Sequence, residues 1–146
     1  MPEVRIEPVT VDNYIAVIDL RVGEDQREFV APNVRSLADA WAYPTARPYA
    51  IVDGAEPVGF TLLYPSPDDS RTVTVVRFMI DHRFQGRGLG GAGLEAVLAR
   101  ARADGCQRVR LSVAPHNEVA RRLYASAGFR ETGEIDEGEI MLALEV

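Results

Sequence analysis

The sequence has a single cysteine and no long hydrophobic run. Because one cysteine cannot form an internal disulfide, we expect Cys106 to be packed between a helix and a strand, and we expect neither a disulfide scaffold nor a metal site. No apolar stretch approaches the ~20 residues that span a bilayer. The start Met1-Pro2-Glu3 also lacks the basic and then apolar layout of a signal peptide. These absences exclude a membrane-spanning or disulfide-rich protein and predict a cytoplasmic protein with no membrane partner.

Basic residues are outnumbered by acidic residues. Sixteen Lys and Arg residues against 22 Asp and Glu residues give a formal net charge of −6. This balance disfavours nucleic acid as a partner and makes a small cationic substrate easier to recruit. A chain of 146 residues with 47% hydrophobic residues is typical of one globular domain, so we expect residues 1–146 to form a single domain.

Period-two apolar runs separated by turn residues predict seven strands. They are Val4 to Val9, Pro48 to Val52, Val58 to Tyr64, Val73 to Ile80, Arg108 to Val113, Phe129 to Ile135 and Glu139 to Leu144. Asp53-Gly54 is a strong hairpin signal, and Asp136-Glu137-Gly138 is a second tight turn. The three strands from Pro48 to Ile80 form a predicted meander.

Apolar residues three and four apart predict four helices. The first follows Thr10 and has Tyr14, Ile15, Ile18 and Val22 as its apolar stripe. The second starts at Asn33 or Ser36, ends at Pro44, and buries Leu37, Ala40 and Trp41. The others run from Gly91 to Asp104 and from Asn117 to Ala127. The order β-α-α-β-β-β-α-β-α-β-β predicts an α/β (α+β) fold with a mixed sheet flanked by helices.

The segment Gln85-Gly86-Arg87-Gly88-Leu89-Gly90 lies between a predicted strand and a predicted helix. Glycines allow backbone conformations in which successive N–H groups converge on one anion, and the start of the helix adds free N–H groups and a positive dipole end. The segment therefore predicts a phosphate-binding loop. A plain turn is the alternative, but it would not need five glycines between residues 86 and 93.

Two other phosphate motifs fit less well. The G-x-G-x-x-G fingerprint matches twice, but no acidic residue follows about 20 positions later, where a dinucleotide site needs one for the ribose. No Gly-Lys-Ser/Thr follows the loop, which excludes a nucleoside triphosphate P-loop.

A third pattern fits: Gln85-x-x-Gly88-x-Gly90, followed by Asn117-x-x-Ala120-x-x-x-Tyr124-x-x-x-Gly128-Phe129. With these motifs the chain resembles the GNAT superfamily of N-acetyltransferases over essentially its whole length. It also resembles the bacterial spermine/spermidine N-acetyltransferase subgroup, in residues 26–33, 36–38, 48–51, 58–60 and 132–135. The resemblance implies a mostly antiparallel sheet and acetyl-CoA as the cosubstrate.

The resemblance further implies which residues bind acetyl-CoA. The backbone of Phe78, Met79 and Ile80 would pair with the pantetheine arm, and splaying of Arg108 to Val113 from this strand would open the cleft. The pyrophosphate would lie on the loop. The expected cofactor-binding residues are Phe78, Met79, Ile80, Gln85, Gly86, Arg87, Gly88, Leu89, Gly90, Gly91 and Asn117.

Tyr124 is the expected catalytic residue. It follows Asn117 by seven residues, about 700° of helical rotation, so both lie on one helix face. A phenol with a pKa near ~10 is protonated at neutral pH and can donate to the leaving thiolate. The alternative is a core tyrosine; the glycine loop upstream favours the catalytic role.

The residues that bind the amine and accept its proton stay open. Glu24, Asp25 and Glu28 are expected to bind the substrate, and the candidates for the base are these three together with Glu134, Asp136 and Glu137. A polyamine such as spermidine or spermine is the leading acceptor, since several carboxylates would suit several ammonium groups. A protein N-terminus, an amino acid, an aminoglycoside, or a non-catalytic acyl-CoA sensor are alternatives. Open strand edges and the apolar strand Ile140 to Leu144 permit a homodimer.

Overall fold

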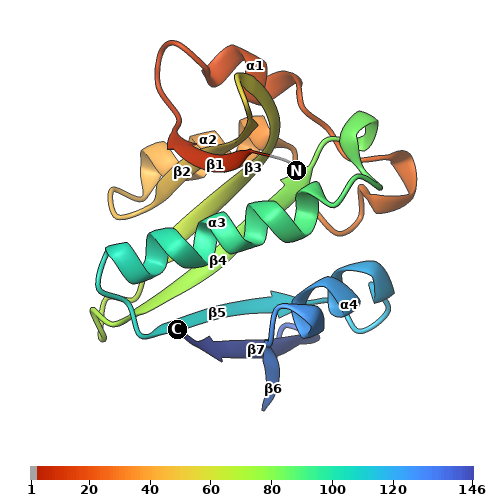
Figure 1. Ribbon diagram of the computed structural model, residues 1–146. Coiled ribbons are helices and arrows are strands. Elements are labelled where there is room, and N and C mark those ends of the chain that lie inside the picture. Colours follow the sequence, from red (N-terminus) through yellow and green to blue (C-terminus); the bar gives the residue numbers. More distant parts are fainter. Residues whose placement is uncertain (1–2) are drawn as a thin grey trace.

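A computed structural model describes residues 3–146, which contain one seven-stranded sheet of order β1-β2-β3-β4-β5-β7-β6 (Figure 1). The absence of a signal peptide was predicted from Met1, Pro2 and Glu3. Of these three residues, Met1 and Pro2 lie outside the described residues. The strands are β1 Val4–Pro8, β2 Arg47–Asp53, β3 Glu56–Pro65, β4 Thr72–Ile80, β5 Arg108–Val113, β6 Arg130–Asp136 and β7 Glu139–Glu145. Five of the six pairings are antiparallel, and β4 pairs with β5 in parallel. The predicted element order and the mostly antiparallel sheet are confirmed.

Helices cover both faces of the sheet. They are α1 Tyr14–Asp19, α2 Asn33–Ala42, α3 Leu89–Ala103 and α4 Glu118–Ser126, with short 3-10 helices at Glu24–Gln26 and His82–Phe84. Successive residues of β2 point to opposite faces. Tyr49 packs in the cluster that contains α3 and α4, and Ala50 packs in the cluster that contains α1 and α2. Among residues 3–146, no helix has both the length and the apolar character needed to cross a membrane.

Two details of the N-terminal helices were predicted wrongly. Helix α1 ends at Asp19 and buries Val17, while Ile15 of the predicted stripe is 57% exposed. In α2 the buried positions are Asn33 and Ser36, and Trp41 is 88% exposed because it is turned about 80 to 140° away from them. Asn33 does not cap the helix; its Nδ2 donates to the Val17 carbonyl at 2.9 Å and so ties α2 to α1.

The sheet opens between its two parallel strands. The β4–β5 pairing ends at Val75 and Leu111, whereas β4 stays paired with β3 as far as Ile80. A bulge marks the point of divergence, because β3 pairs with Arg77 and then with Val75, which leaves Val76 as the extra residue. Figure 1 shows β4 and β5 diverging toward α4. The splaying that the family resemblance implied is confirmed, and it leaves the backbone edge of β4 from Val76 to Ile80 without a neighbouring strand.

Candidate active site

The glycine-rich loop presents free backbone N–H groups at the start of α3. Gly86 and Gly88 have φ angles of 80° and 78°, a left-handed conformation that favours glycine. The first helical hydrogen bond is donated by the Ala92 N–H to the Gly88 carbonyl at 3.1 Å. No group within residues 3–146 accepts a backbone hydrogen bond from the N–H groups of residues 86–91. These donors and the positive end of the helix dipole are suited to bind an anion.

The other three glycines have different surroundings. A Cβ on Gly93 would lie 3.1 Å from Ile51 Cγ2, so close packing explains this glycine. A Cβ on Gly90 would make an ordinary contact with Leu123 at 3.6 Å, and one on Gly91 would meet nothing within 4 Å. Packing and φ therefore do not explain Gly90 and Gly91, although each glycine costs the helix roughly 0.5–1 kcal/mol relative to alanine. The open space beside the free N–H groups fits a diphosphate that approaches the backbone closely.

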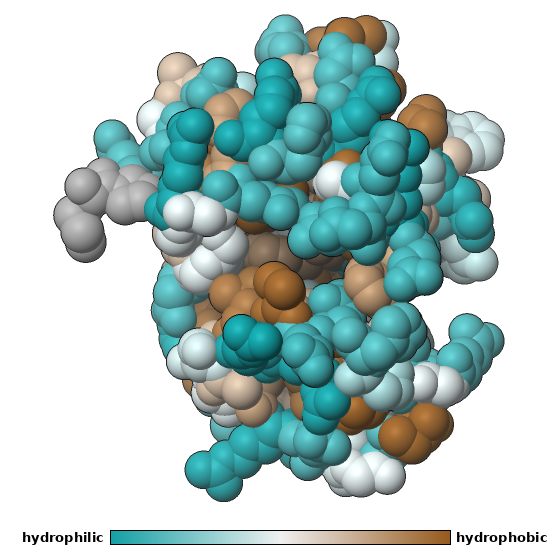
Figure 2. All heavy atoms as spheres, turned by 90° about the vertical axis from the view of Figure 1, so that its right-hand side faces the viewer, coloured by the Kyte–Doolittle hydropathy of each residue, from teal (hydrophilic) through white to brown (hydrophobic). Residues whose placement is uncertain are grey.

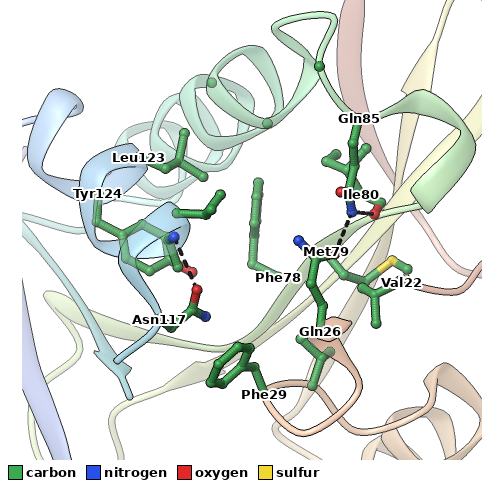
Figure 3. A pocket seen from close by; sticks show the side chains of 16 residues that line it. Val22, Gln26, Phe29, Phe78, Met79, Ile80, Gln85, Asn117, Leu123 and Tyr124 are labelled. Atoms are coloured by element: carbon green, nitrogen blue, oxygen red, sulfur yellow. Dashed lines mark hydrogen bonds between the residues drawn. The ribbon is translucent and has the colours of Figure 1, made fainter. Parts of the chain in front are cut away.

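A cavity of about 370 Å³ extends from this loop to α4. Figure 2 shows a hollow on this side of the molecule with hydrophobic side chains at its floor. In Figure 3, Tyr124, Leu123 and Asn117 lie on one side of the cavity and Ile80 and Gln85 on the other, with Phe78 between them. Nine of the predicted site residues line it, namely Phe78, Met79, Ile80, Gln85, Gly86, Gly90, Gly91, Asn117 and Tyr124. We call it the loop cavity.

Three predicted cofactor residues lie beside the loop cavity without lining it. Arg87 and Gly88 are exposed on the loop, and the Arg87 guanidinium carbon lies 5.7 Å from the centre of the Phe84 ring. The Leu89 side chain is buried in a core cluster with Ile51, so at this position only the backbone N–H faces outward.

A second cavity of about 500 Å³ lies along β4, β5 and β7, and we call it the acidic cavity. Its polar lining includes Arg77, Ser112, Asp136, Glu137 and Glu139. Six residues line both cavities: Phe29, Val30, Phe78, Asn117, Ala120 and Tyr124. Two ligands that enter separately would therefore meet beside Tyr124, where β4 and β5 diverge.

Tyr124 is held at this junction by packing. Its side chain is 8% exposed, and its ring lies edge-on to Phe129 with the ring centres 6.0 Å apart. Burial, with a smaller contribution from the negative charge of Glu139, raises the pKa of the Tyr124 hydroxyl to about 12. The phenol is therefore protonated throughout the physiological range and is available as a proton donor.

Two amide side chains fix the walls of the loop cavity. Asn117 Oδ1 accepts a hydrogen bond from the Ala120 N–H at 3.3 Å and caps α4. Gln85 Nε2 donates to the Ile80 carbonyl and to Gln26 Oε1, both at 2.9 Å. Gln85 thus ties the glycine-rich loop to the end of β4 and to the segment after α1.

The segment 24–30 lies across the opening. Phe29 and Val30 line both cavities, and the Phe29 ring centre lies 5.0 Å from that of His116. Of the three predicted substrate residues in this segment, Glu28 Oε1 lies 3.5 Å from His116 Nε2, whereas Glu24 and Asp25 are exposed on the 3-10 helix. None of the three lines either cavity.

Asp81 holds the loop to the body of the protein. Its fully buried carboxylate accepts hydrogen bonds from the backbone N–H of Arg21 and from the N–H and Nε of Arg83, at 2.8 to 2.9 Å. Burial alone raises the pKa of the Asp81 carboxyl, but the three hydrogen bonds and the positive charge of Arg83 outweigh it, so the net pKa is lowered. The carboxylate therefore stabilises the folded state above the unfolded pKa of ~3.9, and this contribution is lost as pH falls through the lower folded pKa.

Replacing Asp81 with asparagine is expected to lower the free energy of unfolding by about 2–4 kcal/mol at pH 7, because a buried charge-assisted network is broken. The difference between wild type and variant should shrink as the pH falls below about 4. Urea denaturation at several pH values measures both effects. Asp68→Asn, at an exposed loop position, should leave stability within about 0.5 kcal/mol; an equal loss in both variants would contradict the role of Asp81.

Two cavities that meet at a buried tyrosine suit a transferase with two substrates. The family model described as "Acetyltransferase (GNAT) family" matches residues 14–129. The chain belongs to this family, whose members transfer an acetyl group from acetyl-CoA.

Individual relatives agree with this assignment. A spermine/spermidine N(1)-acetyltransferase of Bacillus subtilis (strain 168) is 34% identical over 150 residues, which cover 98% of this chain and 99% of the relative. An L-2,4-diaminobutyric acid acetyltransferase of Streptomyces anulatus is 33% identical over 89 residues, 59% of this chain and 51% of the relative. The fold matches the crystal structure of a GNAT family acetyltransferase from Elizabethkingia anophelis with acetyl-CoA bound, with a TM-score of 0.70 and 20% identity over 98% of each chain.

Proposed function

We propose that residues 1–146 form one domain that acetylates a primary amine of a polyamine such as spermidine or spermine. The observation that carries the proposal is the meeting of two cavities at Tyr124, one ending at the glycine-rich loop and the other at three carboxylates. The full-length similarity to a spermine/spermidine acetyltransferase supports the choice of acceptor. We place the reaction in the cytoplasm.

Acetyl-CoA fits the loop cavity in its chemistry. The free N–H groups of residues 86–91 would hold the pyrophosphate, and the unpaired edge of β4 at Phe78, Met79 and Ile80 would hydrogen-bond the amides of the pantetheine arm. Asn117 would lie beside that arm at the junction. Bound there, acetyl-CoA supplies a thioester whose carbonyl carbon the amine attacks.

Tyr124 would donate the proton that the coenzyme A sulfur needs as it leaves. A phenol with a pKa of about 12 is a weak acid compared with a thiol, whose pKa in water is ~8.5. However, the burial that raises the pKa of the phenol also raises the proton affinity of a thiolate that forms beside it, so the two groups are better matched in the site than in water.

The acidic cavity would bind the amine. Asp136, the last residue of β6, and Glu137, in the turn that follows, are exposed and line this cavity. Each would pair with a distal ammonium group of an extended polycation. Glu24, Asp25 and Glu28, at the exposed segment across the opening, would attract a cation as it approaches rather than hold it in place.

Arg77 favours a second candidate acceptor, a diamino acid. It lines the acidic cavity, its Nε is buried, and no group among residues 3–146 accepts a hydrogen bond from that nitrogen. Such a guanidinium suits the carboxylate of a ligand. The partial similarity to a diaminobutyric acid acetyltransferase agrees with this alternative.

Replacing Arg77 with glutamine distinguishes the two acceptors. If the substrate is a diamino acid, kcat/KM for 2,4-diaminobutyrate should fall about 10- to 100-fold, because one charge-assisted hydrogen bond to its carboxylate is lost. If it is a polyamine, kcat/KM for spermidine should stay equal or rise, because a repelling charge is removed. Release of free coenzyme A thiol reports both rates.

All 16 Lys and Arg residues of the chain are arginine, so no lysine side chain of the enzyme competes with the added amine for the acetyl group. Arg71→Gln, which removes the same charge at an exposed position that lines neither cavity, is the matched control. If the wild type acetylates neither spermidine nor 2,4-diaminobutyrate nor any other primary amine in a panel, the proposed function is wrong.

A further inference from the structure

Amine acetylation also needs a group that takes a proton from the attacking amine. An alkylammonium has a pKa near ~10, so at neutral pH it cannot attack until it loses a proton. Strand β4, which runs through the junction, has no carboxylate between Thr72 and Ile80. The next residue, Asp81, is fully buried and already accepts hydrogen bonds from Arg21 and Arg83. The proton acceptor must therefore come from another element.

Three carboxylates line the acidic cavity, and their settings differ. Asp136 and Glu137 are exposed at the β6–β7 turn, whereas Glu139, the first residue of β7, is half-buried. Ser112 Oγ of β5 donates a hydrogen bond to Glu139 Oε1 at 2.7 Å. This bond fixes the carboxylate and leaves its second oxygen without a protein partner among the described residues.

Glu139 is also close to the proton donor. Both side chains line the acidic cavity, and the charge of Glu139 contributes to the raised pKa of Tyr124. The other charged groups of this cavity are Arg77 on β4 and the carboxylates of Asp136 and Glu137. Of the carboxylates, Glu139 combines partial burial, a fixed orientation and electrostatic contact with Tyr124.

We propose that Glu139 accepts the proton that the attacking ammonium group loses. The inference rests on the proposed function, because it requires an amine acceptor. It identifies a catalytic residue that the sequence did not suggest, and Ser112 as the residue that positions it.

The protons balance with these two groups. The ammonium carries three N–H protons, of which one remains in the amide. Glu139 takes the first and passes it through the cavity to solvent, which frees the lone pair that forms the C–N bond. As the C–S bond breaks, Tyr124 gives its proton to the sulfur, and the resulting phenolate takes the third N–H proton. Both side chains then have their starting protonation states.

The test is Glu139→Gln, which keeps the size of the side chain and its ability to accept a hydrogen bond from Ser112. At pH 7 we expect kcat/KM for spermidine to fall about 100-fold or more, the usual contribution of a general base. The variant should regain activity as the pH approaches ~10, where the amine loses its proton without help. With 2,2,2-trifluoroethylamine, which is already neutral at pH 7, variant and wild type should differ by less than about threefold.

Glu137→Gln is the matched control, because it removes the same charge from the same cavity. It should raise KM for spermidine and leave the pH profile unchanged. Ser112→Ala should lower kcat/KM less than Glu139→Gln does. It should likewise regain activity as the pH rises. An unchanged pH profile in Glu139→Gln, or an equal loss with both amines, would overturn the assignment.

Wild-type turnover of spermidine tests the proposed function separately, and titration calorimetry with coenzyme A shows whether each variant is folded. If the wild type prefers another amine, the same comparison is made with that amine.

Discussion

Tyr124→Phe is expected to lower kcat about 100-fold or more while leaving the Kd for coenzyme A within about twofold. The substitution removes one hydroxyl and keeps the ring that packs against Phe129. Without a donor the sulfur must leave as a thiolate in a poorly solvated site, which raises the barrier to C–S cleavage. Steady-state kinetics and titration calorimetry measure the two quantities.

The raised pKa of Tyr124 adds a pH signature to this prediction. A group with an ordinary phenol pKa of ~10 would lose its proton near the upper end of the assay range, and activity would fall there. With a pKa of about 12, the donor stays protonated, so we expect no alkaline decline caused by Tyr124 below about pH 11.

The free energy of unfolding should also change with pH as Tyr124 ionises. In the unfolded chain Tyr124 ionises near ~10, whereas in the folded protein it resists ionisation, so its contribution to stability is present below pH 10 and is lost as the pH rises toward 12. Tyr124→Phe should lack this decline.

Tyr49→Phe is the matched control for both effects. Tyr49 is also buried, 4% exposed, but it lies on β2 with its ring 5.5 Å from the guanidinium carbon of Arg100, away from the two cavities. The Tyr49 variant should retain wild-type kcat. A similar loss in both variants, or full activity in Tyr124→Phe, would remove Tyr124 from the reaction.

Gly91→Leu is expected to weaken coenzyme A binding about 10- to 100-fold while stabilising the fold by roughly 0.5–1 kcal/mol. The opposite signs follow from the surroundings of Gly91. It lies in the first turn of α3, and a Cβ there would contact no protein atom within 4 Å, so leucine improves helix propensity without a clash. The added side chain would occupy the space beside the free N–H groups, where the diphosphate is proposed to lie. Calorimetric binding and thermal unfolding separate the two effects.

Ala99→Leu places the same side chain at an exposed position of the same helix. It should change neither binding nor stability by more than about 0.5 kcal/mol. Wild-type affinity in Gly91→Leu would show that the ligand does not approach this part of the backbone.

Much of the fold could be predicted because its signals are local. The Asp53-Gly54 turn, the glycines before α3 and the alternation in β4 each depend on neighbouring residues, and the strand bounds agree with the structure to within about two residues. Helix α1 was misjudged because six residues are too few for a periodic stripe to be reliable. The exposure of Trp41 could not be predicted, since it depends on which face of α2 turns toward the sheet, and Asn33 fixes that face through a bond to α1.

The candidate site was predictable where one motif contained it. Gly86, Gly90, Asn117 and Tyr124 line one cavity, as the motif spacing suggested, although their roles stay predictions. Arg77, Ser112 and Glu139 were missed because they come from three strands that only the folded sheet brings together. Their one sequence signal, a polar residue within a strand, is shared by most surface strands.

The divergence of β4 and β5 also bears on how the products leave. The loop cavity and the acidic cavity overlap only at the residues around Tyr124, so with the two ligands bound as proposed the acetylated amine would have an exit that does not cross the path of the spent coenzyme. The chain's single thiol, Cys106, precedes β5 at the end where that strand is still paired with β4, far along the strand from the junction. The thiol of Cys106 is therefore not placed to take up the acetyl group, which agrees with the proposed direct transfer from acetyl-CoA to the amine.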